Sequence, residues 1–102
     1  MPIKISFDAH HLHDFCQQQN IKRLALFGSV LRDDFSPTSD IDVLVEFEDG
    51  QTPSLLWWPE MIEKLSKIFD GRRIDLVTPR SLNPRIKSAV LAEAVNQYVQ
   101  KK

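Results

Sequence analysis

The chain has 102 residues with 13 basic and 14 acidic side chains, so its formal net charge is −1. This length predicts one domain spanning residues 1–102, with a single core and no room for a separate substrate-binding module. The missing excess of positive charge argues against primary nucleic-acid binding. Cys16 is the sole cysteine, which excludes an internal disulfide and favours the reducing cytoplasm. No signal peptide or membrane-length apolar run is present in the sequence, so no membrane partner is expected.

Residues 8–20 are expected to form the first helix, with Asp8 as its N-cap and Asn20 at its end. Leu12, Phe15 and Cys16 recur at helical spacing and predict an apolar stripe. This position favours a buried, inert thiol at Cys16 over a nucleophile.

Three histidines, His10, His11 and His13, lie in the same segment. Only His10 and His13 share a helical face, and two ligands without a third make a poor metal site. We therefore interpret the three side chains as solvated surface residues.

Residues 23–27, with an apolar run over residues 24–27, predict the first core strand, and a Gly-Ser turn follows it. Gly28 has no Cβ, so the backbone can turn sharply there or approach a ligand closely. We expect Ser29 to cap a short helical turn over residues 30–34. Such a turn directs free N–H groups and the positive end of a helix dipole at an anion.

The stretch SDIDVLVEF alternates in the way that predicts a half-buried strand. Asp40 and Asp42 are two residues apart and share one face. Two neighbouring ionised carboxylates repel each other and are costly to bury unless a cation lies between them. A hard divalent ion such as Mg²⁺ is the simplest choice. The opposite face is apolar and comprises Ile41, Val43, Val45 and Phe47.

A long helix is expected over residues 55–69, with Pro59 tolerated only if the helix begins near Trp58 or its first turn is bent. Trp57 and Trp58 cannot both point into one core, because adjacent helical residues diverge by about 100°. One of them is interpreted as a partner contact or as partly buried under the preceding loop.

Residues 73–77 predict a further strand, on which Asp75 lies opposite the apolar Ile74 and Leu76. Next to the strand of Asp40 and Asp42, Asp75 could join them around a metal. A structural alternative is an ion pair of Asp75 with Arg72, Arg73 or Arg80.

Asn83 and Pro84 are expected to begin a final helix as N-cap and N1 residues, after a loop over residues 78–82. Its buried side is predicted to step by four residues, and the helix to end near Tyr98. The side comprises Ile86, Val90, Ala94 and Tyr98. A basic cluster follows the third strand, either to contact a triphosphate or an acidic partner or as solvated surface; it comprises Arg80, Arg85 and Lys87.

These elements predict an α/β (α+β) fold, a small mixed β-sheet of at least three strands backed by helices on one face. The order of Gly-Ser, ten residues, Asp-Ile-Asp and a later strand aspartate resembles the nucleotidyltransferase superfamily of DNA polymerase beta. GSVLR and SDIDVLV are similar, more narrowly, to the minimal nucleotidyltransferase (MNT) proteins, which are encoded beside HEPN-domain ribonuclease toxins. The likeness extends over nearly the whole chain and includes RRIDLVTPRSL. One departure lies in the loop, where Leu31 and Asp33 replace a small residue and a glycine.

The resemblance implies an Mg²⁺-dependent enzyme that transfers AMP from ATP to a tyrosine hydroxyl of a cognate HEPN toxin, acting as an antitoxin in a hetero-oligomer. It also implies that the attacking hydroxyl is deprotonated with help from Asp75. Arg32 is expected either near the phosphates or in a surface pair with Asp33 or Asp34. The implied site comprises Asp40, Asp42 and Asp75 as catalytic ligands of two Mg²⁺ ions, and Gly28, Ser29 and Arg32 as nucleotide-binding residues.

Two other functions stay open on the sequence. The chain could neutralise its partner by binding alone, without catalysis. It could also transfer a nucleotide to a small molecule such as an antibiotic, for which so short a chain would have to build the acceptor pocket by oligomerising.

Overall fold

The computed structural model describes residues 7–32, 36 and 39–100. Short 3₁₀ turns cover Gly28–Leu31, Leu55–Trp57 and Pro79–Ser81. The helices and strands are, in chain order, α1 Ala9–Gln18, β1 Ile21–Phe27, β2 Ile41–Phe47, α2 Trp58–Ile68, β3 Ile74–Val77, α3 Pro84–Glu93 and β4 Val95–Val99.

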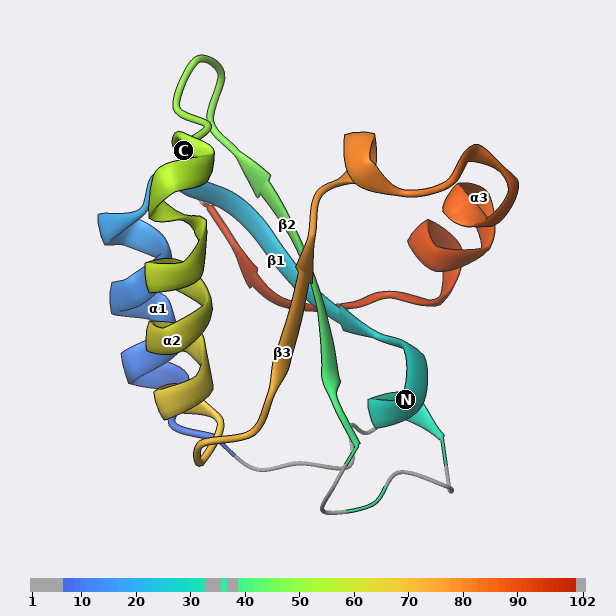
Figure 1. Cartoon of the computed structure of the whole chain (residues 1–102), viewed down its shortest axis with the longest axis horizontal. Coiled ribbons are helices and arrows are strands. Elements are labelled where there is room, and N and C mark those ends of the chain that lie inside the picture. The colour runs from blue at the N-terminus through green and yellow to red at the C-terminus, as the bar shows by residue number, and fades with distance from the viewer. Residues whose placement is uncertain (1–6, 33–35, 37–38, 101–102) are drawn as a thin grey trace.

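The strands form one mixed sheet in the order β3-β2-β1-β4 (Figure 1). β1 runs antiparallel to both of its neighbours, whereas β2 and β3 are parallel. Parallel neighbours need a long connection, and α2 supplies it between β2 and β3. The predicted α+β class with a small mixed sheet is therefore confirmed.

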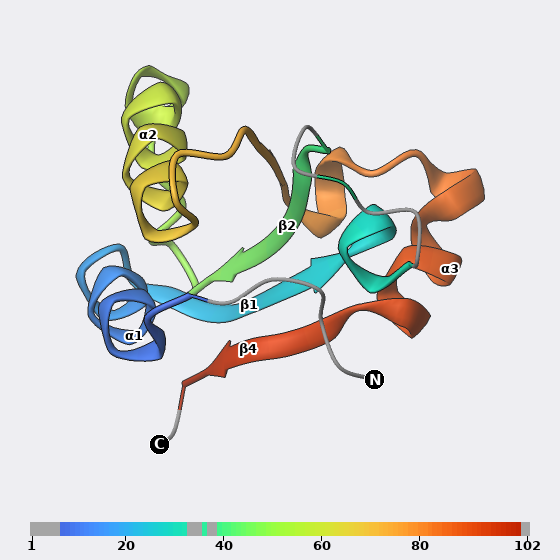
Figure 2. The same ribbon diagram turned by 90° about the horizontal axis from the view of Figure 1, so that it is seen from below.

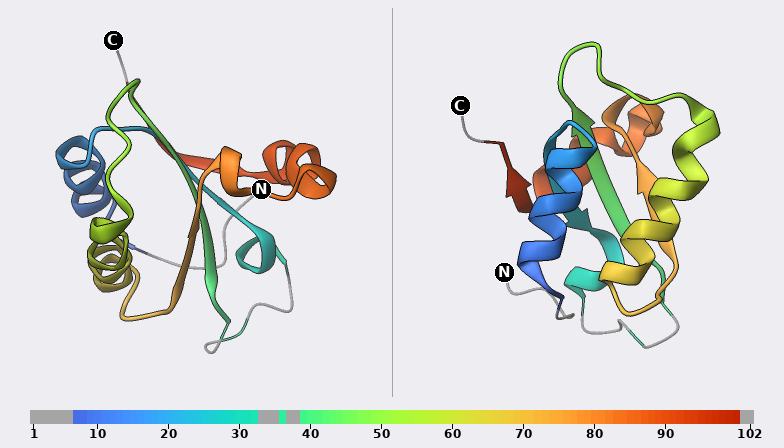
Figure 3. Two further views of the ribbon diagram at one scale, coloured as in Figure 1. Left: turned by 45° about the horizontal axis from the view of Figure 1, so that its top comes forward. Right: turned by 90° about the vertical axis from the view of Figure 1, so that its left-hand side faces the viewer.

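One face of the sheet is covered by α1 and α2, which lie side by side (Figures 2 and 3). The strand alternation predicted for β2 is confirmed, because Ile41, Val43 and Val45 are fully buried in the core between the sheet and these helices. The polar residues of β2 are thereby directed to the other face.

That other face carries a smaller apolar cluster of Phe27, Leu44 and Val90. Val90 belongs to α3, which lies on the side of the sheet opposite α1 and α2 (Figure 3). The helices α1 and α2 form the expected backing layer, and α3 adds a partial layer on the face of Asp42.

The first helix begins as predicted, with the Asp8 carboxylate accepting hydrogen bonds from the backbone N–H groups of His10 and His11 at 2.9 and 3.3 Å. Cys16 is fully buried on its inner side, and burial raises the pKa of its thiol to about 12. The thiol therefore stays protonated and inert at neutral pH. The surface interpretation of the histidines is confirmed by their exposure.

Pro59 has the effect foreseen for it, since α2 begins at Trp58 after a separate 3₁₀ turn and carries the proline in its first turn. Trp58 packs on Phe47 with 6.1 Å between the ring centroids. Trp57 is 60% exposed. The two tryptophans thus point different ways, Trp58 partly buried against the core and Trp57 toward the surface.

The predicted helix over residues 84–98 is wrong beyond Glu93. Ala94 is extended, with φ −60° and ψ 135°, and β4 then pairs with β1. Tyr98 is buried, but from a strand, and Ile86 at the other end of the expected stripe is 51% exposed. Spacing by four residues matched a helix by coincidence. The β-branched and aromatic residues of VNQYV favour a strand, and the free edge of β1 supplies their backbone partners.

Among the described residues, no helix combines the length and the apolar character that crossing a bilayer requires.

Candidate active site

The turn after β1 is built around Gly28, whose φ of +74° lies in the left-handed region. A Cβ at this position would lie 2.2 Å from Oδ2 of Asp42. Side chains other than hydrogen are therefore excluded both by backbone conformation and by the carboxylate beside it. Glycine is needed here so that the turn and Asp42 can be in contact.

The sequence predicted that Ser29 caps a helical turn over residues 30–34. That prediction is wrong for Ser29, because the 3₁₀ turn already begins at Gly28. Its hydroxyl donates to the backbone carbonyl of Asp40 at 3.3 Å, and its backbone N–H donates to the Asp42 carboxylate. Ser29 thus connects the turn to Asp40, just before β2, and to Asp42 within it. The last two residues of the predicted helical turn, Asp33 and Asp34, lie outside the described part of the chain.

Asp42 and Asp75 are brought together by the parallel pairing of β2 and β3, in which they are direct partners. Burial raises the pKa of Asp42 to about 6, and the adjacent Asp75 carboxylate adds to that rise by charge repulsion and a shared hydrogen bond. The backbone N–H of Ser29 acts in the opposite direction and lowers it. Asp42 therefore holds its proton to a higher pH than an isolated carboxylate would, and a bound cation could take the place of that proton.

Asp40 lies just before β2, and its Oδ1 is 3.2 Å from Nε of Arg73. The backbone N–H of Ile41 donates to the Arg73 carbonyl at 2.9 Å, so the beginnings of β2 and β3 are tied together. Arg73, one of the three arginines considered as partners of Asp75, therefore pairs with Asp40. Both side chains are largely exposed, and such a pair is weak.

Arg32 lies at the end of the turn and pairs with a residue that sequence reasoning missed. Its guanidinium is 3.6 Å from Oε2 of Glu93, whose Oε1 accepts the backbone N–H of Gly28 at 3.1 Å. Glu93 is the last residue of α3. The sequence analysis missed Glu93 because it predicted an uninterrupted helix through this segment and so expected no helix end there.

The donor set fits a hard divalent cation. Mg²⁺ is commonly held by one or two carboxylates together with phosphate oxygens of a substrate, and Asp42 and Asp75 supply two adjacent carboxylates. Within residues 7–32, 36 and 39–100, no three His, Cys, Asp or Glu side chains are already gathered as a complete metal site. The substrate would thus contribute ligands of its own.

The basic cluster predicted after the third strand lies on the 3₁₀ turn and on α3. Arg80 and Arg85 are exposed and Lys87 is half-buried. That this basic cluster contacts a triphosphate or an acidic partner, or is solvated surface, stays a prediction.

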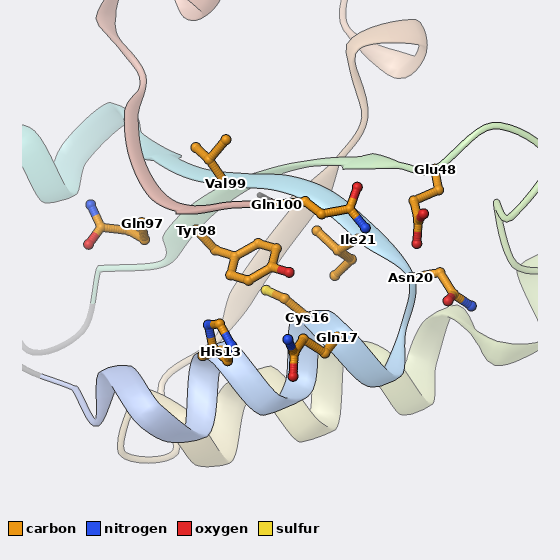
Figure 4. A pocket seen from close by; sticks show the side chains of 10 residues that line it. All are labelled: His13, Cys16, Gln17, Asn20, Ile21, Glu48, Gln97, Tyr98, Val99 and Gln100. Atoms are coloured by element: carbon orange, nitrogen blue, oxygen red, sulfur yellow. The ribbon is translucent and has the colours of Figure 1, made fainter. Parts of the chain in front are cut away.

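A hollow of about 610 Å³ lies elsewhere, between α1 and β4. In Figure 4 the ring of Tyr98 lies next to the sulfur of Cys16, with His13 on the α1 side. None of the six predicted site residues lines this hollow. It opens near the end of β1 that is remote from Gly28, so it is distinct from the paired carboxylates.

A glycine turn packed against a strand carboxylate, which is itself paired with a second carboxylate on the neighbouring strand, defines a class of domain suited to metal-assisted chemistry on nucleotide phosphates. Residues 10–96 match the family model described as the nucleotidyltransferase domain. The chain belongs to the nucleotidyltransferase family and is an enzyme of that class.

Comparison with individual relatives identifies the subfamily within this family. The chain is 36% identical over 85 residues to the protein adenylyltransferase MntA of Thermococcus cleftensis, with 83% of each chain covered. A solved structure described as a minimal nucleotidyltransferase superposes with a TM-score of 0.69 and 36% identity, covering 85% of this chain and 86% of that one. The predicted membership in the minimal nucleotidyltransferases is confirmed.

A more distant structure shows the same fold in an assembly. The complex of an AMPylated HEPN toxin of Shewanella oneidensis with its MNT antitoxin includes a chain that matches with a TM-score of 0.63 and 21% identity, covering 90% of this chain and 70% of that one.

Proposed function

We propose that this protein is an antitoxin that transfers AMP from ATP to a tyrosine hydroxyl of a HEPN-family toxin. The observation that carries the proposal is the pairing of Asp42 with Asp75 across β2 and β3, next to the turn at Gly28. The names of the relatives support adenylyl transfer, and the AMPylated complex supports a HEPN toxin as acceptor. We place the reaction in the cytoplasm, where ATP is available.

In this proposal Asp42 and Asp75, with Asp40 released from Arg73, hold two Mg²⁺ ions. The metal would neutralise the charge that develops on the leaving pyrophosphate. Gly28, Ser29 and Arg32 bind the phosphate tail. Most of the catalysis would then be positioning and electrostatics.

The acceptor side of the reaction needs a base, because a tyrosine hydroxyl has an ordinary pKa near 10. Asp75 lies at an exposed position on β3 and would assist the loss of that proton. The tyrosine oxygen forms a bond to the α-phosphorus as the bond from that phosphorus to pyrophosphate breaks, and the proton passes to the carboxylate or to solvent.

The test is to mix the full chain, its partner, Mg²⁺ and ATP labelled at the α-phosphate, and to follow label on the partner. Asp42→Asn and Asp75→Asn should each lower the transfer rate by roughly a hundredfold or more. Asp49→Asn is a matched control, since Asp49 is an exposed residue in the turn after β2.

Three outcomes would contradict the proposal in different ways. Transfer that persists in both site variants would remove these carboxylates from the chemistry. Neutralisation of the toxin that survives both substitutions unchanged would favour a binding-only antitoxin. Label on a small molecule instead of on the partner would favour the small-molecule enzyme.

A further inference from the structure

Glu93 contacts two of the three residues to which the proposed function assigns the phosphates, Gly28 and Arg32. One carboxylate oxygen accepts the Gly28 N–H at 3.1 Å, and the other is 3.6 Å from the Arg32 guanidinium. Each oxygen thus contacts a different donor of the proposed phosphate site. The turn and the end of α3 lie on the same side of the sheet (Figure 3).

We propose that Glu93 is a placeholder carboxylate, which binds Gly28 and Arg32 in the nucleotide-free chain and is displaced when the triphosphate enters. The inference rests on the phosphate placement of the proposed function and adds a specific competitor to it. Gly28 has one backbone N–H, so a phosphate oxygen that accepts it replaces the Glu93 oxygen there.

The contact of Glu93 with Arg32 is weak enough for a phosphate to displace it. The side chains of Arg32 and Glu93 are 58% and 37% exposed, and ion pairs of such exposure contribute little stability. Glu93 also lies at the C-terminal end of α3, where the helix dipole disfavours a negative charge. A triphosphate offers more negative charge and more acceptor oxygens, and arginine binds phosphate in a bidentate manner that one carboxylate oxygen at 3.6 Å does not match.

Glu93 also adds negative charge to a site that already contains Asp40, Asp42 and Asp75. Its removal should therefore favour an incoming phosphate in two ways, by freeing the donors and by reducing repulsion. A structural role for Glu93 predicts the opposite sign, because a misplaced turn would bind phosphate less well.

The experiment is a calorimetric titration of the full chain with inorganic tripolyphosphate, and with a non-hydrolysable ATP analogue in the presence of Mg²⁺. Glu93→Gln retains the size of the side chain and removes its charge, and Glu93→Ala removes the contact. Both should bind either probe about five- to tenfold more tightly than the unchanged chain. Circular dichroism checks that each variant is folded.

Glu63→Gln is the matched control, since Glu63 is an exposed residue on α2 paired with Lys67 at 3.8 Å. It should leave the affinity unchanged. In an Arg32→Ala background, the gain from Glu93→Gln should shrink to about twofold, because one of the two competed donors is absent.

Weaker or unchanged binding in folded Glu93→Gln would overturn the placeholder, as would a failure of every form of the chain to bind either probe. The labelled-transfer assay separates this result from the proposed function. Transfer to the partner without a change in affinity would leave the function intact and refute the placeholder. Tighter binding by Glu93→Gln without transfer would retain the placeholder and refute the function.

Discussion

At the scale of single residues, the site depends on a close contact that only glycine allows. Gly28 has a positive φ and its missing Cβ leaves room for the Asp42 carboxylate. Gly50 has a nearly identical φ of +75°, but nothing lies within 4 Å of a Cβ built there. Substitutions at the two glycines can therefore distinguish the effect of backbone strain from that of a steric conflict with Asp42.

We expect Gly50→Ala to lower the free energy of unfolding by about 1 kcal/mol, the cost of a left-handed alanine, and Gly28→Ala to lower it by at least as much. Only Gly28→Ala should also displace the Asp42 carboxylate and weaken binding of Mg²⁺ with an ATP analogue, by about tenfold or more. Urea denaturation and calorimetry measure the two effects. Equal nucleotide affinity in both variants would contradict the importance of the contact.

At the scale of elements, β4 is the segment whose nature changed between prediction and structure. Its Tyr98 is buried and its ring lies edge-on to His13 with 5.3 Å between centroids. Val99, the next residue, is 54% exposed. Alternation between buried and exposed neighbours is the period of a strand.

Tyr98→Ala should destabilise the chain by about 3 kcal/mol, because it removes a large side chain from the core. Val99→Ala, on the exposed side of the same strand, should change stability by less than about 0.5 kcal/mol. Chemical denaturation of both variants tests this difference. Similar losses in the two variants would argue against the orientation of β4.

At the scale of the whole molecule, the raised pKa of Asp42 couples protonation of the site to folding stability. That pKa is raised from 3.8 to about 6 in the folded chain. Between about pH 4 and pH 6 the folded chain therefore holds a proton that the unfolded chain has lost, so stability falls as the pH rises through this range and stays lower above it.

Without Mg²⁺, we expect the free energy of unfolding to fall by about 1 kcal/mol between about pH 4 and pH 7, after allowance for solvent screening. Mg²⁺ should restore stability above about pH 6, where the proton has left, and have little effect near pH 4. Asp42→Asn should remove both responses. Unfolding curves at several pH values with and without Mg²⁺ provide the measurement; a response to Mg²⁺ that survives the substitution would refute the coupling.

The sequence alone determined the features that are local in the chain. The alternation around Asp42, the cap at Asp8 and the turn at Gly28 follow from short-range periodicity and backbone preference. The resemblance carried by Gly-Ser and Asp-Ile-Asp identified the family, because those motifs keep a fixed spacing.

Tertiary structure decided what depends on partners distant in sequence. The segment after Glu93 forms a strand because the edge of β1 is available to pair with it. The spacing of apolar residues along the chain carries no information about that edge. The contact of Asp42 with Asp75 arises from strand order, and that of Glu93 with Gly28 joins residues 65 positions apart. Such contacts are set by which surfaces pack together, and no short stretch of chain carries that information.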